Sequence, residues 1–267
     1  MFINSSMVQV DRQVELSVTF YQAAKHSRGT ILFCPGLGAT QVGFASDAVF
    51  FAEQGYDCVT VDLRGFGESS RPPQLTLEQY SLERLALDII AILDGTKLRT
   101  INFVGNSLGG VIGLEIIRLR PNALTSLVTF GTTYQLDIPG WMVSIQNVTS
   151  YLLGRKALAY FVAKSSSRHQ HTREIVREMF SSFPNDIGRL VSMNVGQYDY
   201  RSIAGKWNRP ILLLTGDNDR GINQKLAPTL AALSDKPAFH YQMIPNAGHF
   251  ANLDNPRGFR QALLNFL

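Results

Sequence analysis

The feature that most constrains the fold of this chain is a serine between glycines, at the point where a strand-type run gives way to helical spacing. The segment is Gly105-Asn106-Ser107-Leu108-Gly109. Before it, Thr100–Val104 is rich in β-branched and aromatic residues, and after it residues 108–119 carry apolar side chains at helical intervals. A turn this tight needs small neighbours and strains its central residue. The pattern predicts that the Ser107 hydroxyl stands clear of a sheet, at the N-terminus of a helix.

A serine hydroxyl is a weak nucleophile at neutral pH, so a catalytic role for Ser107 requires a histidine base and a carboxylate that orients the base. Two later loops carry such groups. The continuous apolar run Ile211–Thr215 leads into a loop with Asp217 and Asp219, and a later strand-type run leads into a loop with His249. Both aspartates are therefore candidates for the acid.

The order serine, aspartate, histidine along the chain is that of the α/β-hydrolase triad, and it differs from the orders in chymotrypsin-like and subtilisin-like proteases. Two further segments make the chain resemble the α/β-hydrolase family. The strand-type run Ile31–Cys34 leads to Pro35-Gly36-Leu37-Gly38, which is similar to the family's oxyanion loop. Asp62–Ser69 is similar to its D-x-R-G-x-G-x-S turn. The resemblance covers nearly the whole chain.

This resemblance implies a catalytic triad. It favours Asp219 over Asp217 as the acid, so Ser107, Asp219 and His249 are the expected catalytic residues, with Asp217 as a turn former. Solvated or structural roles are expected for the other histidines, which are His26, His169, His171 and His240.

The expected oxyanion hole departs from the family in one respect. The family often has a histidine before the first glycine of the oxyanion loop, whereas this chain has Pro35, which has no N–H to donate. We therefore expect the backbone N–H groups of Leu37 and Leu108 to bind the oxyanion.

Strand-type runs alternate with helical runs, which predicts an α/β fold with a mostly parallel β-sheet flanked by helices. With 267 residues, 45% of them hydrophobic, the chain can fill one large core without a separate second domain. The expected strands are 31–34, 56–61, 100–104, 126–130, 211–215 and 239–244, and the expected helices are 42–54, 77–93, 111–119, 224–233 and 256–267.

The interval between the strands at 126–130 and 211–215 is too long for one crossover connection. An insertion here resembles the helical cap that roofs the active site of α/β-hydrolases. We therefore expect a core of residues 1–134 and 208–267 and a helical cap of residues 135–207. The cap sequence is broken by Gly140, Gly154, Pro184 and Gly196, and its apolar positions at helical spacing include Trp141, Ile145, Val148, Leu152, Ile175 and Met179.

These features together predict a serine hydrolase that cleaves a carboxylic ester or lactone of a small to medium apolar acyl substrate through an acyl-enzyme, without a cofactor. The segment that follows His249, with the cap, resembles carboxylesterases and enol-lactonases. The Gly-Asn-Ser elbow also occurs in carbon–carbon hydrolases of ring-cleavage products, but these typically have tryptophan where this chain has Phe250. A non-catalytic receptor on the same scaffold is a further alternative, against which the complete triad argues.

Charge is unevenly distributed along the chain. Residues 155–209 hold ten Lys and Arg against four acidic residues, whereas the whole chain has a net charge of +4. A basic cap could attract an acidic substrate, an acidic acyl carrier protein or an anionic membrane surface, or it could be a solvated helical face. If the basic cap attracts an acyl carrier protein, an alternative function is that of an esterase or thioesterase acting on a carrier-bound substrate.

Other classes of function lack support in the sequence. The chain has no Walker loop, no H-E-x-x-H and no C-x-x-C, so we expect no nucleotide or metal cofactor, and its basic residues lack the aromatic interleaving of nucleic-acid binders. Cys34 and Cys58 follow no disulfide spacing and are expected to be buried thiols. The N-terminus has no signal-peptide core and no run reaches transmembrane length, so we expect a cytoplasmic enzyme with a small-molecule substrate.

Overall fold

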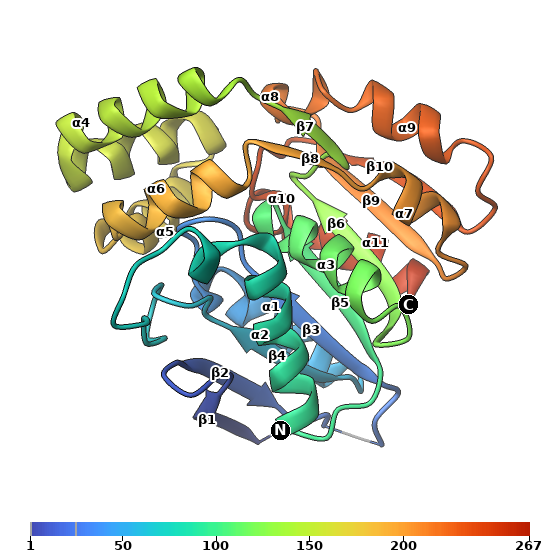
Figure 1. Ribbon diagram of the computed structural model, residues 1–267. Coiled ribbons are helices and arrows are strands. Elements are labelled where there is room, and N and C mark those ends of the chain that lie inside the picture. Colours follow the sequence, from blue (N-terminus) through green and yellow to red (C-terminus); the bar gives the residue numbers. More distant parts are fainter. Residues whose placement is uncertain (1, 25) are drawn as a thin grey trace.

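A central β-sheet of eight strands organises the molecule (Figure 1). The computed structural model describes residues 2–24 and 26–267, and it describes residues 143–153 by their backbone alone. The strands of the sheet are β1 (Ile3–Gln9), β2 (Glu15–Tyr21), β3 (Thr30–Cys34), β4 (Asp57–Val61), β5 (Ile101–Asn106), β6 (Leu124–Phe130), β9 (Ile211–Gly216) and β10 (Phe239–Ile244). Two short strands, β7 (Gln135–Asp137) and β8 (Gln197–Asp199), form a separate antiparallel pair.

The strand order makes the carboxyl end of β3 the switch point of the sheet. The order is β1-β2-β4-β3-β5-β6-β9-β10, with antiparallel pairing of β1 with β2 and of β2 with β4, and parallel pairing from β4 to β10. Strand β3 therefore has β4 on one side and β5 on the other. In open α/β sheets, ligands bind at such a switch point, outside the carboxyl ends of the strands. The predicted α/β class with a mostly parallel sheet is confirmed.

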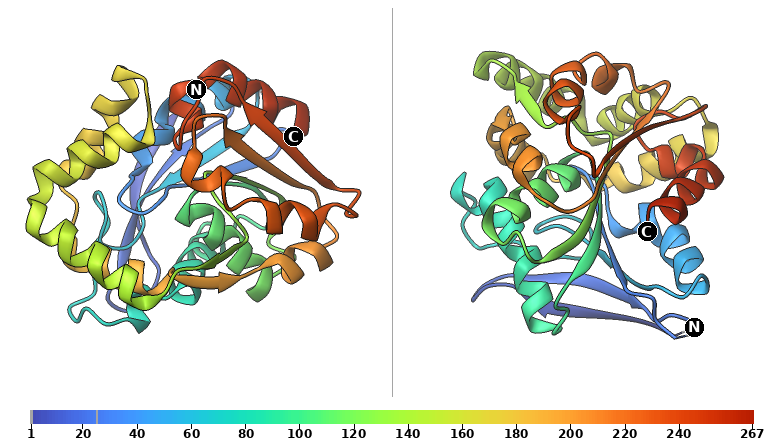
Figure 2. Two further views of the ribbon diagram at one scale, coloured as in Figure 1. Left: turned by 90° about the horizontal axis from the view of Figure 1, so that it is seen from above. Right: turned by 90° about the vertical axis from the view of Figure 1, so that its right-hand side faces the viewer.

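Helices cover both faces of the sheet (Figure 2). Apolar side chains alternate along the inner strands, so that in β9 Leu213 faces the cluster under α2 and α3, while Leu212 and Leu214 face the cluster under α1 and α11. The helices are α1 (Ala45–Glu53), α2 (Leu82–Gly95), α3 (Leu108–Leu119), α4 (Gly140–Ser166), α5 (Gln170–Ser181), α6 (Asn185–Asn194), α7 (Arg201–Lys206), α8 (Arg220–Asn223), α9 (Ala227–Leu233), α10 (Ala251–Asp254) and α11 (Pro256–Phe266), with 3₁₀ turns η1 (Gln41–Phe44) and η2 (Glu78–Tyr80).

Several predicted helix boundaries were wrong. The helix expected from residue 77 is interrupted at Ser81, whose extended backbone and hydroxyl cap α2 by accepting a hydrogen bond from Arg84 N (3.1 Å). The helix expected over 224–233 begins later, at Ala227 of α9, and the separate short helix α8 precedes the expected range. The segment expected to begin a helix at Val42 opens with the 3₁₀ turn η1. The helix expected over 111–119 begins earlier, at Leu108.

An insertion of three longer helices joins β6 to β9. Helices α4, α5 and α6 lie over the carboxyl ends of the strands (Figure 1). Strand β7 precedes α4, strand β8 follows α6, and the two strands pair with each other where this segment of the chain begins and ends. Four interruptions were expected in this range. Gly140 begins α4, Gly154 kinks α4 with φ at 71°, Pro184 precedes α6, and Gly196 lies between α6 and β8. Helix α7, also inside the range 135–207, packs against α3 and α9. The side chains of Ile145, Val148 and Leu152 lie outside the described residues.

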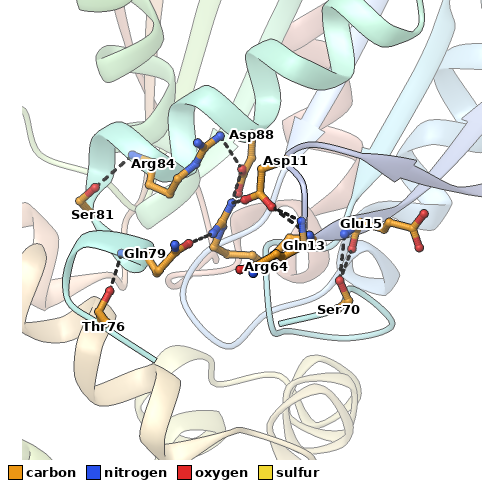
Figure 3. Close-up of polar contacts among 11 residues, drawn as sticks. Asp11, Gln13, Glu15, Arg64, Ser70, Thr76, Gln79, Ser81, Arg84 and Asp88 are labelled. Carbon is orange, nitrogen blue, oxygen red and sulfur yellow. Dashed lines mark hydrogen bonds and ion pairs between the residues drawn. The ribbon is translucent and has the colours of Figure 1, made fainter. Parts of the chain in front are cut away.

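A buried arginine ties the turn after β4 to the N-terminal strands and to α2 (Figure 3). The fully buried Arg64 guanidinium donates Nε to Asp88 Oδ2 (2.6 Å) and Nη2 to both Asp88 Oδ1 (2.5 Å) and Asp11 Oδ2 (2.9 Å), and its Nη1 donates to Gln79 Oε1 (2.7 Å). Burial alone would lower the pKa of Arg64, but Asp88 and Asp11 raise it above its usual range. Breaking such a buried pair costs about 3–5 kcal/mol, so this network fixes the turn firmly.

Candidate active site

Ser107 occupies a strained turn between β5 and α3. Its backbone has φ 51° and ψ −115°, in the positive-φ region that residues with side chains rarely adopt. Ser107 N donates to Phe130 O (2.8 Å), and its partly exposed hydroxyl makes no capping bond to α3. The hydroxyl therefore stands free of the secondary structure that holds its backbone, in the geometry that the sequence predicted.

Two glycines of the elbow have no room for a side chain. A Cβ added at Gly105 would lie 2.4 Å from the carbonyl carbon of Gly109, and one added at Gly109 would lie 2.2 Å from Cys34 O. Strand β5, helix α3 and the end of β3 are therefore in direct backbone contact. This close approach explains why small residues flank Ser107.

Asp219 and His249 form a hydrogen-bonded pair beside the elbow. His249 Nδ1 lies 2.8 Å from Asp219 Oδ2, and the side chains are 24% and 8% exposed, respectively. Asp219 follows β9 and caps α8, while His249 follows β10. A carboxylate at Nδ1 favours the tautomer with the proton on Nδ1, which leaves Nε2 as the acceptor in a neutral imidazole.

The elbow and the histidine loop are joined by Asn106 and by Gly131. Asn106 Nδ2 donates to His249 O (3.1 Å), and a Cβ added at Gly131 would lie 2.9 Å from His249 Cε1, so the imidazole ring packs on the Gly131 backbone. In the described part of the chain the Ser107 hydroxyl has no hydrogen bond to His249. Such contacts are often long before substrate binds.

Asp217 has a different environment from Asp219. It is exposed, and its Oδ1 accepts hydrogen bonds from Ala247 N (3.0 Å) and Asn218 Nδ2 (2.7 Å). Slight burial acts to raise the pKa of Asp217, but the hydrogen bonds from the backbone of Asn246 and Ala247 outweigh it and lower the pKa. Asp217 therefore connects two loops, and the imidazole of His249 is paired with Asp219 instead.

The expected oxyanion loop lies against the elbow. A Cβ added at Gly36 would lie 3.1 Å from Ser107 Cβ, so residues 35–38 pass directly beside the serine. Leu37 is partly buried in this loop, and Leu108 is the first residue of α3. The first N–H groups of a helix have no partner within that helix, which makes Leu108 N–H available to an anion.

Aromatic residues of α5 and the following turn cover this loop. Phe180 and Phe183 are stacked with ring centroids 5.5 Å apart, and both rings lie where a Cβ on Gly38 would stand. Phe183 also contacts Phe66, at 6.0 Å between centroids. Helix α5 and the turn after it therefore cover the loop that follows β3 with an apolar surface.

The remaining predicted residues lie apart from this pair. His26 and His171 are exposed, His240 packs against the ring of Phe266, and His169 Nε2 contacts Asn246 O (2.7 Å). Cys34 and Cys58 are free and buried as predicted, and burial raises the pKa of both thiols. Among the described residues no three His, Cys, Asp or Glu side chains gather as a metal site would need.

Some residues that shape the site were not predicted from the sequence. Gly131 follows β6 with φ 61°, and a lone glycine at a strand end gave no specific signal. Asp254 accepts a hydrogen bond from Gly248 N (2.7 Å), and Ser166 O accepts one from His249 N (2.8 Å). Ser166 is far from His249 in sequence, so only the fold brings them together.

A parallel α/β sheet with a serine elbow, and with an aspartate–histidine pair at the carboxyl ends of its later strands, defines the α/β-hydrolase class of folds. Comparison with known families agrees: residues 29–256 match the alpha/beta hydrolase fold family, and the chain belongs to it.

Among curated proteins, the chain is 22% identical over 259 residues to "Putative carbamate hydrolase RutD" of Pseudomonas syringae pv. syringae (strain B728a), covering 92% of this chain and 97% of that protein. Two solved structures share the fold. A hydrolase from Pseudomonas aeruginosa PA01 has a TM-score of 0.84 at 22% identity, with 98% of each chain covered. The enol-lactonase from Burkholderia xenovorans LB400 has a TM-score of 0.83 at 18% identity, again with 98% of each chain covered.

Among the residues that the structure describes, no helix combines the length and the apolar character needed to cross a bilayer.

Proposed function

We propose that this α/β hydrolase is a serine hydrolase that cleaves a carboxylic ester or lactone of a small to medium apolar acyl substrate. The observation that carries the proposal is the Asp219–His249 pair, in which Oδ2 and Nδ1 are 2.8 Å apart. The backbone carbonyl of His249 accepts a hydrogen bond from Asn106, the neighbour of Ser107 in the strained turn. A buried carboxylate, an oriented imidazole and an unengaged serine hydroxyl are the parts that acyl transfer to serine requires.

In the proposed mechanism, His249 takes the proton of the Ser107 hydroxyl as the serine oxygen attacks the carbonyl carbon. The backbone N–H groups of Leu108 and Leu37 hold the oxyanion of the tetrahedral intermediate, each such donor contributing about 3 kcal/mol. His249 then gives its proton to the leaving group, and an acyl-enzyme remains. A water activated by His249 hydrolyses it, while Asp219 holds the imidazole in the required tautomer.

The apolar cover of the loop that follows β3 supports an apolar acyl group. Phe180 and Phe183 are nearly buried and lie against the oxyanion loop, so the acyl chain or ring would meet aromatic surface beside the reacting carbonyl. In this proposal residues 135–207 form the cap over a core of 1–134 and 208–267. The enol-lactonase among the structural relatives makes a lactone a natural candidate substrate.

A fluorophosphonate label tests the proposal without knowledge of the substrate. We expect it to attach to one residue, Ser107, because only a serine beside a general base is activated towards such reagents. Peptide mass spectrometry after labelling identifies the residue, and Ser107→Ala and His249→Ala variants should remain unlabelled. Labelling of a different serine, or none with folded protein, would contradict the proposal and favour a receptor on this scaffold.

The carrier-protein alternative rests on the basic surface of the cap. Exposed basic side chains there include Lys156, Lys164 and Arg177, whereas Arg173 donates to Ser167 O (2.7 Å) within the protein. Exposed charges act over about 8 Å at physiological ionic strength, so salt weakens recruitment of an acidic partner.

For a carrier esterase, kcat/KM on an acyl carrier protein substrate should fall steeply with rising salt, while hydrolysis of a small neutral ester stays nearly constant. Reversal of Lys164 and Arg177 to glutamate should reproduce the effect of high salt. Equal salt dependence for both substrates would leave the small-molecule esterase and assign the basic residues to a solvated face.

A further inference from the structure

The loop that carries His249 is held on one side by the core of the protein. Asn106 Nδ2 donates to His249 O (3.1 Å), Ala247 N donates to Asp217 Oδ1 (3.0 Å), and Asn218 N donates to Ala247 O (2.8 Å). These contacts come from the elbow and from the loop after β9. They fix the loop towards the sheet.

On its other side, the same loop is bonded to the junction between α4 and α5, residues 166–169. His249 N donates to Ser166 O (2.8 Å), and His169 Nε2 contacts Asn246 O (2.7 Å). A Cβ added at Gly248 would lie only 2.2 Å from Ser166 O, so the two backbones are in direct contact. The inserted helices therefore reach the backbone of the histidine itself.

One carboxylate connects these two segments. Asp254 Oδ2 accepts a hydrogen bond from Gly248 N (2.7 Å), the residue before His249, and Asp254 Oδ1 accepts one from the Ser167 hydroxyl. Ser167 is buried, and its hydroxyl also accepts a hydrogen bond from His169 N (2.9 Å). Asp254 thus bridges the histidine loop and the helix junction with its two oxygens.

We propose that Asp254 is a positioning residue for His249, and that through Ser167 it links the placement of the inserted helices to that of the base. The proposal rests on the proposed function, in which His249 moves the proton. A general base must lie within hydrogen-bond reach of its proton, and a displacement of about 1 Å can cost 100-fold in rate. A loop held between the core and the helix junction keeps its histidine within that tolerance.

The test compares Asp254→Ala, Asp254→Asn and Ser167→Ala with Ser165→Ala as a matched control. Ser165 is two residues from Ser167 but is exposed, and its hydroxyl donates to Val162 O (3.0 Å) within α4. Hydrolysis of p-nitrophenyl butyrate gives kcat and KM. In parallel, the low-field proton NMR signal of His249 Nδ1–H reports the Asp219–His249 hydrogen bond in the absence of substrate.

We expect Asp254→Ala to lower kcat by about 10- to 100-fold with little change in KM, because the substrate site is intact and only the base is displaced. Ser167→Ala should lower kcat less, and the double variant should resemble Asp254→Ala. Asp254→Asn can accept from Gly248 N and donate to the Ser167 hydroxyl, so it should restore most of the activity. Ser165→Ala should behave as wild type.

The NMR signal should broaden or disappear in Asp254→Ala and persist in Ser165→Ala. If Asp254→Ala has the NMR signal and the kcat of the wild type, the proposal is overturned. It is also overturned if Asp254→Ala has a lower melting temperature with an unchanged NMR signal, and Asp254→Asn does not recover the activity. Failure of the proposed hydrolase function can be distinguished from failure of this proposal. In the first case the wild-type protein would lack esterase activity, while the NMR signal of His249 Nδ1–H would still report whether Asp254 positions His249.

Discussion

Ser107→Ala is expected to reduce kcat for p-nitrophenyl acetate or butyrate by at least about 10⁴-fold, since removal of the nucleophile disables the whole triad. The fold should be unchanged. The Ser107 hydroxyl makes no capping bond to α3, and alanine keeps the Cβ that the positive-φ turn already accommodates. The melting temperature should therefore match that of the wild type.

The measurement needs purified protein and a control for the effects of a serine substitution and of the preparation. Ser165→Ala, prepared in the same way, should retain full activity because the Ser165 hydroxyl is exposed and donates to Val162 O of its own helix. If Ser107→Ala retains more than about a hundredth of the wild-type kcat, the nucleophile is another residue.

Asp219→Asn is expected to reduce kcat by about 10³- to 10⁴-fold. Its amide would donate to His249 Nδ1, 2.8 Å away, and would move the imidazole proton to Nε2, where it prevents acceptance of the serine proton. The substitution should have little effect on folding, because the amide oxygen can still accept the N-capping bond from Ile222 N. Measurement of kcat over a series of pH values, together with melting curves, separates the loss of catalysis from any loss of stability.

Asp217→Asn is the matched control, in the same loop and two residues away. An asparagine there can still accept from Ala247 N, so we expect kcat to fall less than about tenfold. The reverse ranking of the two variants would assign the acid role to Asp217.

Much of the fold could be predicted because each inner strand has a local signature. Strands such as β9, whose residues are all buried, read as continuous apolar runs, and Ser107 lies where such a run meets helical spacing. The N-terminal strands β1 and β2 were not predicted. Strand β1 is almost wholly exposed and is held by its pairing with β2, so its sequence shows no apolar alternation.

Contacts between distant charges could not be predicted. Arg64 and Asp88 look like surface residues in the sequence, since charged side chains are rarely buried, and only the fold shows that they neutralise each other inside the protein. The choice between Asp217 and Asp219 is similar. Both lie in one loop, and the turn of the backbone decides which carboxylate meets the imidazole of His249 and which meets the Ala247 backbone.

The bond from His249 N to Ser166 O has a consequence for engineering by exchange of segments between relatives. A chimera that takes its inserted helices from another hydrolase replaces the acceptor of this bond along with the residues proposed to cover the substrate. The junction 166–169 should therefore stay with the recipient, or be transplanted together with the loop 245–254. The helices over the sheet and the position of His249 can be varied independently only when the crossover points keep these two segments together.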